Sequence, residues 1–224
     1  MFPKLITGIK NAKRILSRSD PLDMTELPDH VAERTRQALG ESLSPTQSVA
    51  KILDDVQTRG DDAVRHYTKM FDEIDLKNIE VSNNDIKNAN ANVPDDISKA
   101  IDIAITRVTQ FHKNSLPKCW MDNADGTGEM YKPIERVGIY VPRGLSSSVV
   151  MSAVPAIVAG VKEVILATPP GKNGIPSNVV LAAAKRSGVH KVFSIGGATA
   201  IAALAFGTET VPGVDKVCGG GNIF

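Results

Sequence analysis

The sequence predicts an α/β protein in which a mainly helical first part is followed by a mostly parallel β-sheet. Two observations lead to this prediction. Residues 1–132 contain 5 glycines, 18 basic and 21 acidic residues, whereas residues 133–224 contain 13 glycines, 8 basic and 4 acidic residues. At the same place, the apolar residues change from helical spacing to short β-branched runs. We therefore expect one structural part over residues 1–132 and another over residues 133–224.

Three amphipathic helices are expected in the first part, because apolar residues recur there at positions i, i+3, i+4 and i+7. Their starts carry suitable signals: Ser44 suits an N-cap, and Asp61 and Asp95 suit the positive end of a helix. The expected helices cover residues 45–59, 61–71 and 95–114, and a short hairpin is expected over 118–132.

The second part alternates between short β-branched runs and alanine-rich helical patterns. Right-handed crossovers place such helices on the faces of a parallel sheet and bring the carboxyl ends of the strands together in one crevice. We expect a ligand in that crevice. The expected strands are 137–141, 163–168, 191–195 and 216–218, and the expected helices are 147–159, 177–187 and 198–206.

The composition excludes several classes of protein. Apolar residues make up 42% and charged residues 23%, and no segment approaches the ~20 apolar residues of a membrane helix. A net charge of +1 argues against a nucleic-acid partner. The first residues lack a secretory core, so the cytoplasm is the expected compartment. Cys119 and Cys218 lack C-x-x-C spacing and are expected to be free thiols.

Three glycine-containing loops leave the carboxyl ends of expected strands, over residues 142–148, 196–199 and 219–222. Glycine lets backbone N–H groups approach a ligand, and a helix N-terminus adds partial positive charge, so these loops suit a phosphate group. Arg143 would add a full charge. Ordinary strand-to-helix turns favour the same residues, and composition does not decide between these interpretations. The G-x-G-x-x-G fingerprint is missing, and Thr168 is followed by Pro-Pro-Gly instead of an acidic residue.

Few other residues have the spacing of a catalytic or metal site. Tyr140 lies on or just after the first strand of the sheet, where its ring would stack on a planar ligand and its hydroxyl would form a hydrogen bond, with burial in the core as the competing interpretation. The serines at 146–148 lack the G-x-S-x-G turn of a hydrolase. The four histidines are scattered without metal-ligand spacing and are expected to be structural or exposed: His30, His66, His112 and His190.

Several stretches resemble the histidinol dehydrogenase family. Residues 133–142, Pro-Ile-Glu-Arg-Val-Gly-Ile-Tyr-Val-Pro, are similar to the segment that enters that family's nucleotide-binding domain. Residues 196–209 resemble its G-G-A-Q-A-I-A-A-L-A-x-G-T-E motif, and residues 211–216 resemble the V-P-x-V-D-K that follows. Residues 59–72 and 111–117 are similar to its N-terminal helical region, so the resemblance covers nearly the whole chain.

This resemblance implies an incomplete Rossmann-like domain over residues 133–224. It also implies the NAD-dependent oxidation of the small alcohol L-histidinol to L-histidine through the aldehyde, in histidine biosynthesis. Family members use a bound zinc ion and an acid/base pair of glutamate and histidine, and they are homodimers. Their N-terminal helices pack with chain that follows the nucleotide-binding domain, so we expect exposed apolar stripes and low solubility or a partner here.

The resemblance assigns three cofactor-binding positions. The family's nucleotide-contacting tyrosine falls on Tyr140, its glutamine falls on Thr199, and the asparagine of its G-P-G-N motif falls on Asn222. Thr199 replaces an amide by a shorter hydroxyl, which weakens or rebuilds one contact. Two loops also differ from the family, because Arg143 stands in a motif that usually reads P-G-G, and Gly220 replaces proline.

The family's zinc ligands and its glutamate and histidine pair lie beyond the G-P-G-N motif. No catalytic or metal-binding residue is therefore assigned in this sequence, and the chain alone is expected to be inactive. The main hypothesis is an N-terminal portion of a histidinol dehydrogenase. A paralogue that oxidises another small alcohol, such as a sulfonated diol, and a non-catalytic nucleotide-binding or dimerisation module are the alternatives.

Overall fold

In a computed structural model of the chain, the described residues are 8–10, 12, 33, 35–37, 39–40 and 43–220. Residues 51–222 form one compact unit, and residues 1–50 with 223–224 form the other. The predicted division into residues 1–132 and 133–224 stays a prediction. None of the described helices combines the length and the apolar character that a membrane span needs.

The first two predicted helices are confirmed as α3 (Pro45–Arg59) and α4 (Asp61–Asp72). A reciprocal cap begins α3, because Gln47 N donates to Ser44 Oγ at 3.3 Å and Ser44 N donates to Gln47 Oε1 at 3.0 Å. In the second unit, the buried Tyr67 of α4 donates its hydroxyl to the carboxylate of Asp55 in α3. Burial raises the pKa of this phenol.

The third predicted helix is confirmed as α6 (Asp95–Asn114), but the sequence analysis missed α5 (Asn83–Ala91) before it. Four of the nine residues of α5 are asparagines, which favour turns over helix interiors. Tertiary contacts stabilise the helix instead. Arg186 donates to Asn90 Oδ1 at 2.9 Å and to the Asp102 carboxylate at 2.7 Å, which ties α8 to α5 and α6.

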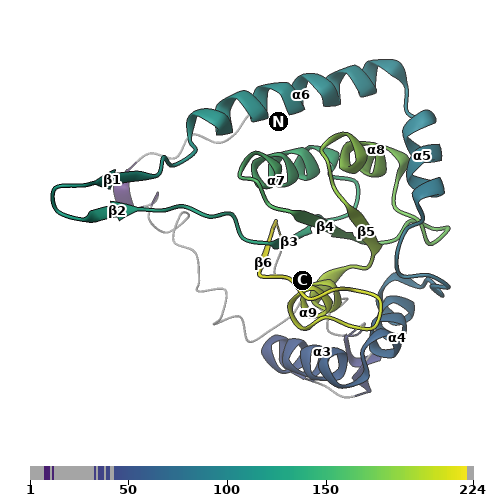
Figure 1. The fold of residues 1–224 in the computed structure, drawn as a ribbon. Helices are drawn as coiled ribbons and strands as arrows, with labels where there is room; N and C mark the ends of the chain where they lie inside the picture. Colours follow the sequence, from purple (N-terminus) through teal and green to yellow (C-terminus); the bar gives the residue numbers. More distant parts are fainter. Residues whose placement is uncertain are drawn as a thin grey trace. The chain divides into compact units, whose positions relative to one another are not determined.

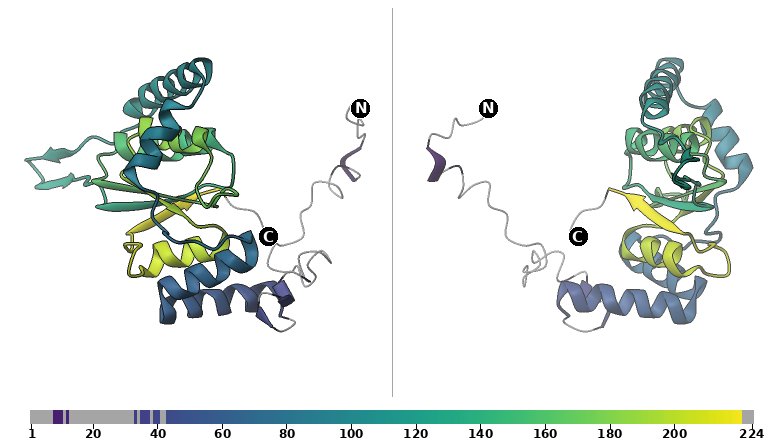
Figure 2. Two further views of the ribbon diagram at one scale, coloured as in Figure 1. Left: turned by 90° about the vertical axis from the view of Figure 1, so that its right-hand side faces the viewer. Right: turned by 60° about the vertical axis from the view of Figure 1, so that its left-hand side comes forward.

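The predicted hairpin is present as β1 (Trp120–Asp122) and β2 (Thr127–Glu129), which pair antiparallel. Gly126 takes a positive φ of 67° in its turn. All residues of both strands are exposed, and the hairpin extends away from the main sheet of its unit (Figure 2). Its structure is therefore local, without support from the core.

The main sheet contains β3 (Arg136–Tyr140), β4 (Glu163–Thr168), β5 (Lys191–Ser194) and β6 (Lys216–Gly219). All neighbouring pairs are parallel, in the order β5-β4-β3-β6, as the α/β prediction requires. One pairing was not predicted. Residues 79–81 run antiparallel along β5, where Val81 N donates to Val192 O at 2.8 Å.

Helices cover both faces of this sheet, as Figure 1 shows. On one face, α7 (Ser146–Val158) and α8 (Asn178–Arg186) pack on the strands, and α6 and α5 pack on these two helices in turn. On the other face, α9 (Gly197–Phe206) packs on β3, β4 and β6, with α4 against it. The largest buried apolar cluster lies between the sheet and α7 and α8. The loops at the carboxyl edge of the strands are thereby held on a rigid support.

Candidate functional site

The carboxyl end of β3 is the point at which the strand order reverses. The chain passes from β3 through α7 to β4 on one side, whereas β6 lies on the other side of β3. Tyr140, the last residue of β3, is opposite Ala167 in β4 and Gly219 in β6. In open α/β sheets, ligands bind in the crevice at such a reversal. The site begins with Tyr140 for this reason.

Tyr140 joins the end of β3 to the start of α9. The backbone N–H of Gly197 donates to the Tyr140 hydroxyl oxygen at 3.1 Å, while the side chain stays partly exposed. Because the hydroxyl oxygen accepts this bond, its own proton is free to be donated to a ligand. The side chain is thus neither fully buried nor fully exposed, and the stacking of its ring on a ligand stays a prediction.

Gly219 allows β6 to approach β3 at this point. Its φ is 150°, and a Cβ atom there would lie 2.0 Å from the carbonyl oxygen of Tyr140. No side chain fits at such a distance, so any other residue forces β6 away from β3. The neighbouring Gly220 has no atom within 4 Å of the same position.

The other two predicted cofactor-binding residues are placed differently. Thr199 lies in the first turn of α9, two residues beyond Gly197, and is 4% exposed. The hydrogen bond between Gly197 and Tyr140 thus places Tyr140 beside the first turn of α9, which contains Thr199. Asn222 lies outside the described residues. No acidic side chain lies in the first turn of α9. The Gly197 N–H donates to Tyr140, and the other N–H groups of this turn suit an anionic ligand.

The loop after β3 is anchored by an ion pair that the sequence analysis did not predict. Arg143 Nη2 lies 2.8 Å from Asp72 Oδ1 at the end of α4. The Arg143 side chain is 57% exposed and the Asp72 side chain is 17% exposed. The pair therefore holds Arg143 at the carboxyl edge of the sheet without burying it.

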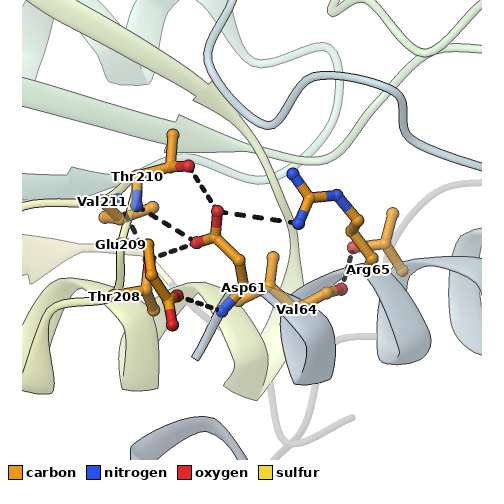
Figure 3. A network of polar contacts seen from close by, with 8 residues as sticks. Asp61, Val64, Arg65, Thr208, Glu209, Thr210 and Val211 are labelled. Carbon is orange, nitrogen blue, oxygen red and sulfur yellow. Dashed lines mark hydrogen bonds and ion pairs between the residues drawn. The ribbon is translucent and has the colours of Figure 1, made fainter. Parts of the chain in front are cut away.

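A buried polar cluster around Asp61 holds the loop between α9 and β6 (Figure 3). The Asp61 carboxylate accepts hydrogen bonds from Thr208 Oγ1 at 2.6 Å, from Thr210 N at 3.2 Å and from the Thr210 hydroxyl. Asp61 N donates to Glu209 Oε2 at 2.8 Å. The sequence analysis noted both segments as family motifs, and periodicity gave no signal that they meet. The cluster fixes the path of the chain into β6.

The sequence model of histidinol dehydrogenases matches residues 35–224. The chain belongs to the histidinol dehydrogenase family. It is 42% identical over 229 aligned residues to the histidinol dehydrogenase of Dehalococcoides mccartyi strain CBDB1, covering 99% of this chain and 51% of that protein.

Other members of the histidinol dehydrogenase family show the same partial coverage. The enzyme of Neisseria meningitidis serogroup A is 47% identical over 185 residues, covering 79% of this chain and 43% of that protein. The crystal structure of histidinol dehydrogenase from Elizabethkingia anophelis matches with a TM-score of 0.76 at 34% identity, covering 81% of this chain and 43% of that chain. The chain thus spans about half the length of these relatives.

The sequence assigned no metal ligand among residues 1–224, and this stays a prediction. Among the residues that the structure describes, no group of three or more His, Cys, Asp or Glu side chains could hold a metal ion. His190 has a structural contact, since its Nδ1 accepts from Val164 N at 3.0 Å beside β4. His30 lies outside the described residues.

Proposed function

We propose that this chain forms the dinucleotide-binding part of a histidinol dehydrogenase, with NAD⁺ bound at the carboxyl ends of β3 and β6. The hydrogen bond from Gly197 N–H to the Tyr140 hydroxyl is the observation that carries this proposal. It places an aromatic ring and a helix N-terminus side by side at the strand reversal. A dinucleotide offers the matching groups, which are planar rings and a pyrophosphate.

Each residue of the proposed site has a distinct task. The Tyr140 ring stacks on a planar group of the ligand, and its hydroxyl proton is donated to a ligand oxygen. The first-turn N–H groups of α9 bind phosphate oxygens. The Thr199 hydroxyl and the Asn222 amide complete the set of contacts that the family resemblance predicts. When bound, NAD⁺ supplies the hydride acceptor for the oxidation of an alcohol.

The activity of the whole protein is a wider proposal, because the chain spans about half the length of its relatives. We infer L-histidinol as the substrate, L-histidine as the product, a homodimer as the assembly and the cytoplasm as the compartment. Zinc does not fit the described residues, since they provide no ligand set for it.

Titration calorimetry with NAD⁺ tests the proposed site. Saturable binding at one site per chain is expected, and Tyr140→Ala is expected to weaken it at least about tenfold by removing the stacking surface. Tyr131→Ala is the matched control, because Tyr131 lies after the hairpin and is 46% exposed. Its affinity for NAD⁺ should equal that of the unmodified chain.

Two results would overturn the proposal. One is an absence of NAD⁺ binding by a chain whose circular dichroism shows the expected helices. The other is an unchanged affinity in Tyr140→Ala. We also expect no NADH formation when L-histidinol and zinc are added to residues 1–224, since the family resemblance assigns zinc binding and proton transfer to positions beyond Asn222.

A further inference from the structure

The connection between α4 and α5, residues 73–82, passes along the carboxyl edge of the main sheet before it reaches α5 (Figure 1). It lies beside the loop after β4, because a Cβ atom built at Gly174 would be 3.7 Å from Ile74 Cγ2 and 3.6 Å from Leu76 Cδ2. At the end of β5, the carbonyl oxygen of Ile79 accepts a backbone hydrogen bond at 2.8 Å. The connection thus contacts the ends of two neighbouring strands.

The ion pair between Asp72 and Arg143 adds a third contact, with the loop after β3. Asp72 is the last residue of α4, directly before the connection. No residue between Val141 and Val149 is buried, so apolar packing does not hold this loop. Within the described part of the chain, Arg143 forms the one side-chain hydrogen bond from the loop to another element. The position of the loop therefore depends on Asp72.

Two features at the end of α4 are unfavourable for a helix by themselves. Asp72 places a negative charge at the negative end of the helix dipole. Glu73 follows with a φ of 61°, and it is the only non-glycine residue with a positive φ in the described part of the chain. Such local costs are kept where the surrounding structure needs the residues. The pairing of Asp72 with Arg143 supplies one such need.

The loop after β3 borders the proposed dinucleotide site. It begins at Pro142, two residues after Tyr140, at the reversal of the strand order. A dinucleotide at the end of β3 therefore lies against this loop. Ordering a loop on binding lowers the affinity, and a loop that is already held in place avoids this cost.

We propose that Asp72 is a positioning residue of the dinucleotide site, which acts through Arg143 to hold the loop after β3 in the conformation that binds the nucleotide. This inference rests on the proposed function, because it needs a dinucleotide at the end of β3. Arg143 acts by its pairing with Asp72 and not by contact with the ligand. Loss of either partner therefore weakens binding to the same extent.

A double-mutant cycle on NAD⁺ binding, measured by titration calorimetry of the full chain, tests this inference. Asp72→Ala and Arg143→Ala should each raise the dissociation constant about fivefold, and the double variant should raise it no further. Asp102→Ala is the matched control. It breaks an ion pair of similar length, 2.7 Å, at the C-terminal end of α8 and away from the carboxyl edge of the sheet. Its affinity for NAD⁺ should equal that of the unmodified chain.

Hydrogen–deuterium exchange of the unliganded chain follows the loop directly. Asp72→Ala should speed the exchange of the amides over residues 142–149, whereas Asp102→Ala should not. If Asp72→Ala does not fold, Asp72→Asn keeps the size of the side chain, removes its charge and enters the same cycle with the same expected results.

The possible outcomes separate this inference from the proposed function. Tighter NAD⁺ binding by Asp72→Ala, with weaker binding by Arg143→Ala, would show that Arg143 binds the ligand and that Asp72 competes for it. Unchanged affinity in Asp72→Ala, or additive losses in the double variant, would equally overturn the inference and leave the proposed function standing. A folded, unmodified chain that does not bind NAD⁺ would overturn both.

Discussion

A single buried carboxylate, that of Asp61, links the start of α4 to the loop between α9 and β6. Replacement by alanine leaves the Thr208 and Thr210 hydroxyls without their acceptor, in a region with little access to water. We expect Asp61→Ala to lower the free energy of unfolding by about 3 kcal/mol, because hydrogen bonds to a charged group are involved. Urea unfolding gives this value.

Asp62→Ala is the control for that measurement, since Asp62 is the next residue in the first turn of α4 and is exposed. It should change the free energy of unfolding by about 0.5 kcal/mol. Similar losses in both variants would show that the helix dipole, and not the cluster, accounts for the effect.

The two glycines at the end of β6, Gly219 within the strand and Gly220 after it, give a second prediction for single residues. Gly219→Ala would place a Cβ 2.0 Å from the Tyr140 carbonyl oxygen, whereas Gly220→Ala meets no atom within 4 Å. We expect Gly219→Ala to lower the melting temperature by several degrees and to weaken NAD⁺ binding. Gly220→Ala should leave both nearly unchanged. Equal melting temperatures and equal NAD⁺ affinities in the two variants would mean that β6 does not lie this close to β3.

The sequence was informative about some site residues and silent about others. Tyr140 was predicted to lie on or just after a short β-branched run, a pattern that also places it near the carboxyl edge of the sheet. The partnership of Arg143 with Asp72, and that of Asp61 with Thr208, join segments far apart in the chain. Periodicity reports only local structure, so neither pairing was predictable.

The strands β3 and β4 are clamped at their amino ends by an ion pair. Arg136 Nε donates to Glu163 Oε2 at 2.5 Å, and Lys191 in β5 lies 3.5 Å from the same carboxylate. The hydrogen bond from Arg136 lowers the pKa of Glu163 below its ordinary value of 4.5. A lowered pKa in the folded state stabilises the fold above about pH 4.5, and this contribution is lost as the pH falls further.

Glu163→Gln should therefore lower the free energy of unfolding by about 1 kcal/mol at neutral pH. The difference from the unmodified chain should shrink as the pH falls below 4.5, because Glu163 itself becomes protonated there. Urea titrations across that range measure it. Glu135→Gln removes a pair with Lys162 in which both side chains are more than 70% exposed, and should have little effect at any pH. A difference that stays constant with pH would contradict the prediction.

Elements differed in how well the sequence predicted them. Three strands of the main sheet, β3, β4 and β5, matched because buried parallel strands are apolar runs, whereas the more exposed β6 was found from its short β-branched run. Helix α5 did not, since its asparagines resemble a turn and its stability comes from Arg186 and the packing of α8. The segment 79–81 was missed for a related reason, as three residues give no period.

Within the larger compact unit, α6 has one covered and one exposed apolar surface. Ile101 is 7% exposed, whereas Ile103 is 53% exposed and Phe111 is 68% exposed. Exposed apolar groups promote self-association. The double change Ile103→Ser and Phe111→Ser is therefore expected to reduce light scattering at high protein concentration and to change the free energy of unfolding by less than about 1 kcal/mol.

Ile101→Ser serves as the contrasting variant on the same helix. It should cost about 3 kcal/mol, because it replaces a buried side chain by a polar one. If the double variant instead unfolds as easily as Ile101→Ser, then the outer surface of α6 is covered in solution. A partner or a second copy of the chain would then be the occupant to identify.

The two edges of the main sheet differ in whether their outer backbone groups are already paired. Beyond β5, residues 79–81 occupy the backbone groups of the strand, whereas no strand in the described part of the chain pairs with the outer side of β6. Free backbone N–H and C=O groups on a border strand act as a template for further pairing. The outer side of β5 is thus already paired with residues 79–81, whereas the outer side of β6 pairs with no strand in the described part of the chain. A further strand, from this polypeptide or from another, can pair with the outer side of β6.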